Sequence, residues 1–95
     1  MSYTREELIK ISDETHAKYA KEGRIGALQI KQMTDEDRER WKSVTDAAIE
    51  IVHKYDANKD GRIDRFELEA MSQEDKEFMA AAHPHVLMFQ KFRQK

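Results

Sequence analysis

The 95-residue sequence contains no cysteine, which excludes disulfides, thiolate zinc sites and cysteine nucleophiles. One proline and three glycines are too few for a fold built from many β-turns. The longest uninterrupted apolar stretch, residues 78–82, is far too short to span a bilayer. The net charge is −2, and no block of like charge suggests a nucleic-acid-binding arm. These absences leave a small helical protein without a membrane span.

The composition fits that class. Hydrophobic residues make up 39% and charged residues 38% of the chain, as in a helical domain with solvated outer faces. The N-terminus has no apolar signal segment, and Ser2 occupies the position where N-myristoylation needs glycine. No phosphate-binding loop, dinucleotide fingerprint or nucleophile elbow occurs. We therefore expect one all-α domain in the cytoplasm that is not an enzyme and binds no nucleic acid.

Residues 56–67 (DANKDGRIDRFE) place oxygen-bearing side chains at regular positions of a twelve-residue loop. A calcium ion takes its ligands from positions 1, 3, 5, 7, 9 and 12 of such a loop, around a glycine at position 6. The candidate metal ligands at these positions are Asp56, Asn58, Asp60, Arg62 through its backbone carbonyl, Asp64 directly or through a water, and Glu67 with both carboxylate oxygens. Gly61 supplies the positive φ of the turn.

An acidic, solvated turn would explain Asp60 and Gly61, but not the apolar Ile63 or the closing Glu67. These twelve positions resemble the EF-hand superfamily throughout, and a weaker resemblance extends over about residues 4–80. The resemblance implies a paired-hand domain whose loops join back to back. The chain is similar to the middle of sarcoplasmic calcium-binding and photoprotein-like proteins, in which a hand without calcium precedes one that binds it. One calcium ion is the expected cofactor, with magnesium possible at rest.

A second copy of the pattern precedes the loop. Gly23 and Gly61 lie 38 residues apart, as do Met33 and Met71, and each glycine begins the tripeptide Gly-Arg-Ile. Matching runs follow each methionine. A repeat of this length indicates a duplicated helix-loop-helix unit.

The first copy is predicted not to bind calcium. Its loop is two residues shorter, Gly26 replaces the ligand at position 9, and Gln29 replaces the bidentate glutamate, so that only Glu22 remains acidic. A neutral amide offers one weak oxygen where calcium requires two charged ones. We expect this hand to act as a structural partner, with Ile25 pairing with Ile63 in a short two-stranded contact between the loops.

The predicted organisation is a single EF-hand domain over residues 1–95: a degenerate hand at 4–33, a calcium-binding hand at 34–71 and a C-terminal helical extension at 72–95. Helices are expected from Thr4 to about Tyr19, over residues 28–33, and from Thr34 to Tyr55. The long helix carries an amphipathic stripe at i, i+3 and i+4 spacing. This stripe consists of Trp41, Val44, Ala48, Ile51, Val52 and Tyr55. The exit helix is expected to add Phe66, Leu68 and Met71 to the core.

In the C-terminal segment, Ser72 begins a helix that Pro84 divides into residues 73–82 and about 84–93. The second piece spaces Val86, Phe89 and Phe92 by three residues, and Lys91, Arg93 and Lys95 make its end basic. So much apolar surface requires a docking site. Its own domain's groove is preferred, then a second copy or a partner protein, and last a membrane surface.

The leading functional hypothesis is a calcium sensor that changes helix packing and binds a helical segment of a target protein or its own C-terminal helix. The alternatives are a calcium buffer and a light-chain-like scaffold subunit with a structural calcium site.

The four histidines are interpreted as residues without a metal-binding role. His83 and His85, which flank a proline, could form a transition-metal pair, but no third ligand accompanies them. The other two are His16 and His53.

Overall fold

The computed structural model describes residues 3–61, 63–84, 86–90 and 92. Over these residues the chain forms six helices: α1 (Arg5–Tyr19), α2 (Ala27–Gln32), α3 (Asp35–Tyr55), α4 (Arg65–Ala70), α5 (Gln73–Ala82) and α6 (Leu87–Gln90). The all-α prediction is confirmed, since this part of the chain contains no β-strand. No helix within it is both long and apolar enough to cross a membrane.

Each of the three longest helices begins at a hydroxyl side chain. The hydroxyl oxygen accepts a hydrogen bond at 3.1 Å from the backbone N–H three residues further on, which would otherwise lack a partner in the first turn. The pairs are Thr4–Glu7, Thr34–Asp37 and Ser72–Asp75. All three starts agree with the sequence prediction.

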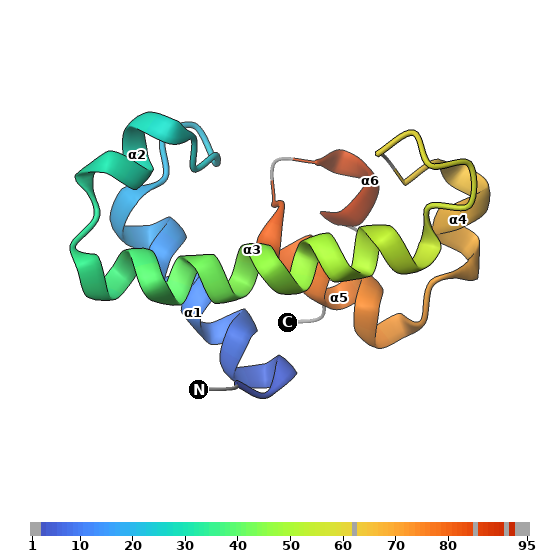
Figure 1. The fold of residues 1–95 in the computed structure, drawn as a ribbon, viewed down its shortest axis with the longest axis horizontal. Coiled ribbons are helices and arrows are strands. Elements are labelled where there is room, and N and C mark those ends of the chain that lie inside the picture. Colours follow the sequence, from blue (N-terminus) through green and yellow to red (C-terminus); the bar gives the residue numbers. More distant parts are fainter. Residues whose placement is uncertain (1–2, 62, 85, 91, 93–95) are drawn as a thin grey trace.

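The core lies where α1, α3 and α5 pack against one another (Figure 1). The predicted stripe on α3 is confirmed, because Trp41, Val44, Ala48 and Ile51 are buried. Val52 and Tyr55 are half-buried against the same core. From the other helices, the buried apolar residues include Leu8 and Ile11 of α1, Leu68 and Met71 at α4, and Phe78, Met79 and Ala82 of α5.

The prediction that Phe66 belongs to the core is wrong. Its side chain is 82% exposed, whereas Leu68 and Met71 are 7% and 4% exposed. The helix α4 has only six residues and contacts α3 with one face. That face carries Glu67, Leu68 and, at its end, Met71, so that Phe66 projects into solvent.

The expected pairing of Ile25 with Ile63 is not formed in the described residues. The only β-bridge there joins Lys21 to Arg24 within the first loop. Two residues separate α2 from α3, and the 21 residues of α3 are about 31 Å long, so α3 carries the second loop away from the first. Figure 1 shows the loops toward opposite ends of α3. Ile25 and Ile63 each pack against the core instead.

The C-terminal segment packs against α5 of its own domain. Its helix α6 has four residues, fewer than the predicted span of about 84–93. Phe89 is 5% exposed, and Val86 and Phe92 pack against the core. The ammonium of Lys76 lies 4.8 Å from the centre of the Phe92 ring. The basic residues Lys91, Arg93 and Lys95 lie outside the described residues.

Deletion of residues 84–95 is expected to expose a dye-binding apolar surface and to lower the melting temperature, because the buried ring of Phe89 leaves the core. Anilinonaphthalene sulfonate fluorescence and thermal unfolding measure the two effects. Phe89→Ser should reproduce both, whereas Met88→Ser, at a side chain that is 36% exposed, should change neither strongly. A deleted chain with unchanged dye binding and stability would contradict the self-docked arrangement.

Candidate metal centre

The candidate site is the loop between α3 and α4, and both of its ends are anchored on helices. Asp56 directly follows the last residue of α3, and Asp64 directly precedes α4 as its N-cap residue. Glu67 is the third residue of α4 and is 6% exposed. The fold thus turns a buried glutamate toward a loop of polar residues.

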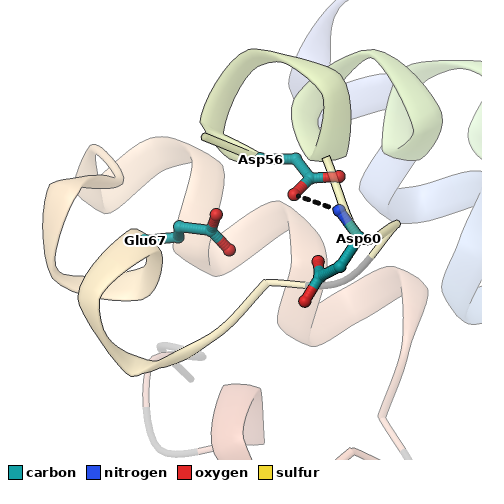
Figure 2. A group of neighbouring side chains, drawn as sticks. All are labelled: Asp56, Asp60 and Glu67. Atoms are coloured by element: carbon teal, nitrogen blue, oxygen red, sulfur yellow. Dashed lines mark hydrogen bonds between the residues drawn. The ribbon is translucent and has the colours of Figure 1, made fainter. Parts of the chain in front are cut away.

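Three predicted ligands lie together. Asp56, Asp60 and Glu67 each offer a carboxylate oxygen, and these three oxygens lie within 4.8 Å of one another. Figure 2 shows the carboxylates pointing into a common space from the end of α3, from the loop and from α4. A group that contains only oxygen donors suits a hard cation such as calcium or magnesium.

The turn of the loop is held by the side chain of Asp56. Its two oxygens accept hydrogen bonds from the N–H of Gly61 at 2.8 Å and from the N–H of Asp60 at 3.2 Å, of which Figure 2 draws the bond from Asp60. Gly61 has φ +78°, and a β-carbon there would meet nothing within 4 Å. Glycine is therefore required at position 6 by backbone conformation rather than by lack of space.

Glu67 joins the two halves of the loop. One carboxylate oxygen accepts from the N–H of Asp64 at 2.9 Å, and the other accepts from the N–H of Ala57 at 2.8 Å. Each oxygen retains a second lone pair that can face a cation. The glutamate at position 12 therefore already lies inside the loop, which is where a bidentate ligand would be needed.

The remaining predicted ligands are placed differently. Asp64 lies outside the group of three, and its Oδ1 accepts from the N–H of Glu67 at 2.9 Å as the cap of α4. This position suits a ligand that acts through water. The side-chain oxygen of Asn58 lies 3.4 Å from the N–H of Asp60, at the edge of the loop. Arg62 lies outside the described residues.

The helix after the first loop, α2, begins in the same way as α4, but the interior of the first loop differs. Gln29 accepts from the N–H of Gly26 at 2.9 Å, as Glu67 does from Asp64. The loop closes as a tight turn in which Glu22 and Gly23 have positive φ. Among the described residues no second group of closely spaced metal-binding side chains occurs beside Asp56, Asp60 and Glu67. The prediction that this loop binds no calcium remains a prediction.

The histidines have varied surroundings. The ring of His16 meets Trp41 edge to face, with 5.3 Å between centroids, and its Nδ1 lies 2.8 Å from the carbonyl oxygen of Ser12. His53 and His83 line an apolar pocket of about 710 Å³ beside α3. That pocket also includes Ile49 and reaches the loop through Asp56 and Gly61. His85 lies outside the described residues.

A contact that the sequence analysis missed encloses the candidate site. The hydroxyl of Tyr55, the last residue of α3, donates to Oδ2 of Asp75 at 2.6 Å and accepts from the N–H of Ser72 at 3.3 Å. We call this arrangement the second tyrosine contact. It joins the residue before the loop to the start of α5, so that the loop and α4 form a closed segment.

The first helix-loop-helix unit, residues 4–33, contains the same arrangement. The hydroxyl of Tyr19 donates to Oδ2 of Asp37 at 2.7 Å and lies 3.4 Å from the N–H of Thr34. We call this the first tyrosine contact. A tyrosine that ends a helix, followed in each repeat by a Thr or Ser and an Asp three residues later, is the sequence signal that could have revealed both.

The charges around Asp75 hold it ionised. Burial raises the pKa of Asp75, but the hydrogen bond from Tyr55 and the charges of Arg5 and Lys54 outweigh burial and leave the pKa below its ordinary value. The nearest ion pairs measure 3.3 Å to Arg5 and 3.5 Å to Lys54. In the first tyrosine contact, hydrogen bonds from Lys18 and Tyr19 likewise lower the pKa of Asp37.

Comparisons with protein-family models, with curated proteins and with solved structures found no match to this chain.

Proposed function

We propose that this chain is a calcium-binding module of the EF-hand type, in which residues 34–71 form the hand that binds the ion. The observation that carries the proposal is the placement of Asp56, Asp60 and Glu67. Their carboxylate oxygens lie within 4.8 Å of one another in a loop with the spacing that calcium requires. The side chain of Asn58, Asp64 through a water, and the backbone carbonyl of Arg62 would complete the shell. The function is binding rather than catalysis.

The proposed role is that of a sensor. The ion neutralises carboxylates that otherwise repel one another, and it thereby changes the conformation preferred by residues 56–61. Asp56, Lys59 and Gly61 also line the apolar pocket of about 710 Å³, together with Ile49 and Val52 of α3. A change in the loop would therefore change a surface suited to a helical segment of a partner protein.

A structural calcium site is the second candidate. The observation that favours it is the position of Glu67, which is buried and hydrogen-bonded to the backbone of Ala57 and Asp64. An α4 whose Glu67 is anchored by these two bonds would move little when the loop binds an ion. In that case calcium would stabilise the fold without altering the pocket.

Calcium titration of the full chain, with magnesium present, tests both candidates. Calorimetry should give one ion per chain with a dissociation constant on the order of 10⁻⁷–10⁻⁵ M. Trp41 fluorescence and a hydrophobic dye are followed in parallel. A rise in dye fluorescence with calcium supports the sensor, and binding without that rise supports the structural site. Absence of binding at millimolar calcium would contradict the proposed function.

A further inference from the structure

We infer that Tyr55 and Asp75 are positioning residues of the calcium site. Their contact holds the start of the loop close to the end of α4, and it thereby prepares the loop to bind the ion. This inference rests on the proposed calcium-binding function. It assigns a role to two residues that lie outside the twelve-residue loop and supply no ligand atom to it.

The described candidate ligands all lie inside one closed segment. Tyr55 directly precedes Asp56, and Ser72 directly follows Met71, which caps the C-terminal end of α4. The Tyr55 hydroxyl bonds to both Ser72 and Asp75, so residues 56–71 begin and end at the same contact. An ion that binds both Asp56, at the start of this segment, and Glu67, near its end, needs these two residues close together. Ordering them in advance reduces the conformational entropy that is lost on binding.

The contact is centred on a buried carboxylate. Asp75 is 4% exposed and lies within ion-pair distance of Arg5 on α1 and Lys54 on α3. Its backbone N–H is also held by the hydroxyl of Ser72. Three helices therefore determine where the carboxylate lies, and the carboxylate determines where Tyr55 and the start of the loop lie.

The first tyrosine contact is an internal control. Tyr19 makes the same bond to Asp37, at 2.7 Å rather than 2.6 Å, and encloses residues 20–33. That segment contains Glu22 as its only acidic residue. Tyr19→Phe and Tyr55→Phe thus remove the same hydroxyl from matched surroundings, but only Tyr55→Phe changes the segment that contains the candidate ligands.

The experiment measures calcium affinity and calcium dissociation on the full-length chain, with stability as a separate readout. We expect Tyr55→Phe to raise the calcium dissociation constant about three- to tenfold, and Tyr19→Phe to change it less than about twofold. Stopped-flow mixing with a chelator should show that Tyr55→Phe loses affinity because it releases calcium faster. Both variants should lower the melting temperature of the calcium-free chain by similar amounts.

The outcomes separate this inference from the function on which it rests. Wild-type protein that takes up no calcium would overturn the proposed function and the inference with it. Calcium binding by the wild type, with equal dissociation constants for Tyr55→Phe and Tyr19→Phe, would overturn the positioning role alone. Asp75→Asn against Asp37→Asn repeats the comparison from the carboxylate side and should give the same asymmetry.

Discussion

Glu67→Gln is expected to lower calcium affinity by two to three orders of magnitude. The substitution removes one unit charge from the ion's shell, and two charges about 4 Å apart interact by about 4 kcal/mol at an effective dielectric constant of 20. A carboxamide also offers one coordinating oxygen where the carboxylate offers two. Calorimetric titration of the variant against the wild type measures the loss.

The chain itself supports the view that this variant will fold. Gln29 occupies the equivalent position after the first loop, and its side-chain oxygen accepts from the N–H of Gly26 at 2.9 Å. Glu67 makes the same bond to Asp64 at the same distance. The variant should therefore keep the start of α4 and lose only the bond to Ala57, at a cost of about 1 kcal/mol.

A matched control removes the same charge from the same helix. Glu69 is exposed on α4, and Glu69→Gln should change calcium affinity by less than about threefold because solvent and salt screen its charge. Circular dichroism confirms that both variants remain helical. Wild-type-like calcium binding by Glu67→Gln would refute the loop assignment, whereas a similar loss in both variants would indicate a general effect of charge.

Helix starts were predictable from the sequence because they depend on local chemistry. Thr4, Thr34 and Ser72 each act within one turn of their own helix, and the burial of Trp41 and Val44 follows from spacing along a single helix. The proximity of three loop carboxylates is local in the same sense, since all lie within twelve residues. Such features depend on only a few neighbouring residues.

Features that join distant segments were not predictable in this way. Pairing of Ile25 with Ile63 depends on where a 21-residue helix directs the second loop, and no residue in either loop encodes that direction. Phe66 has the same chemical character as Phe78, yet α4 is too short to bury a second face. The tyrosine contacts join residues 18 and 20 positions apart, and only the recurrence of the same residue types in both repeats signals them in the sequence.

Phe78→Ala is expected to destabilise the protein by about 3–5 kcal/mol, the cost of removing a fully buried aromatic ring and leaving a cavity. Phe78 is 0% exposed on α5, and the Arg5 guanidinium lies 4.8 Å from its ring centre. For a domain of this length, whose total stability is on the order of 5–15 kcal/mol, such a loss is a large fraction of the whole. Urea unfolding, followed by Trp41 fluorescence and circular dichroism, measures the change.

Phe66→Ala is the matched control, because it removes the same side chain from an 82% exposed position and should change stability by less than about 0.5 kcal/mol.

Calcium binding is expected to offset the loss of stability in Phe78→Ala. An ion that binds only the folded chain stabilises it by about 2.7 kcal/mol at a concentration one hundred times its dissociation constant. Saturating calcium should therefore restore much of the stability of Phe78→Ala, but should restore little in the double variant with Glu67→Gln. Equal recovery in both would show that the ion acts elsewhere.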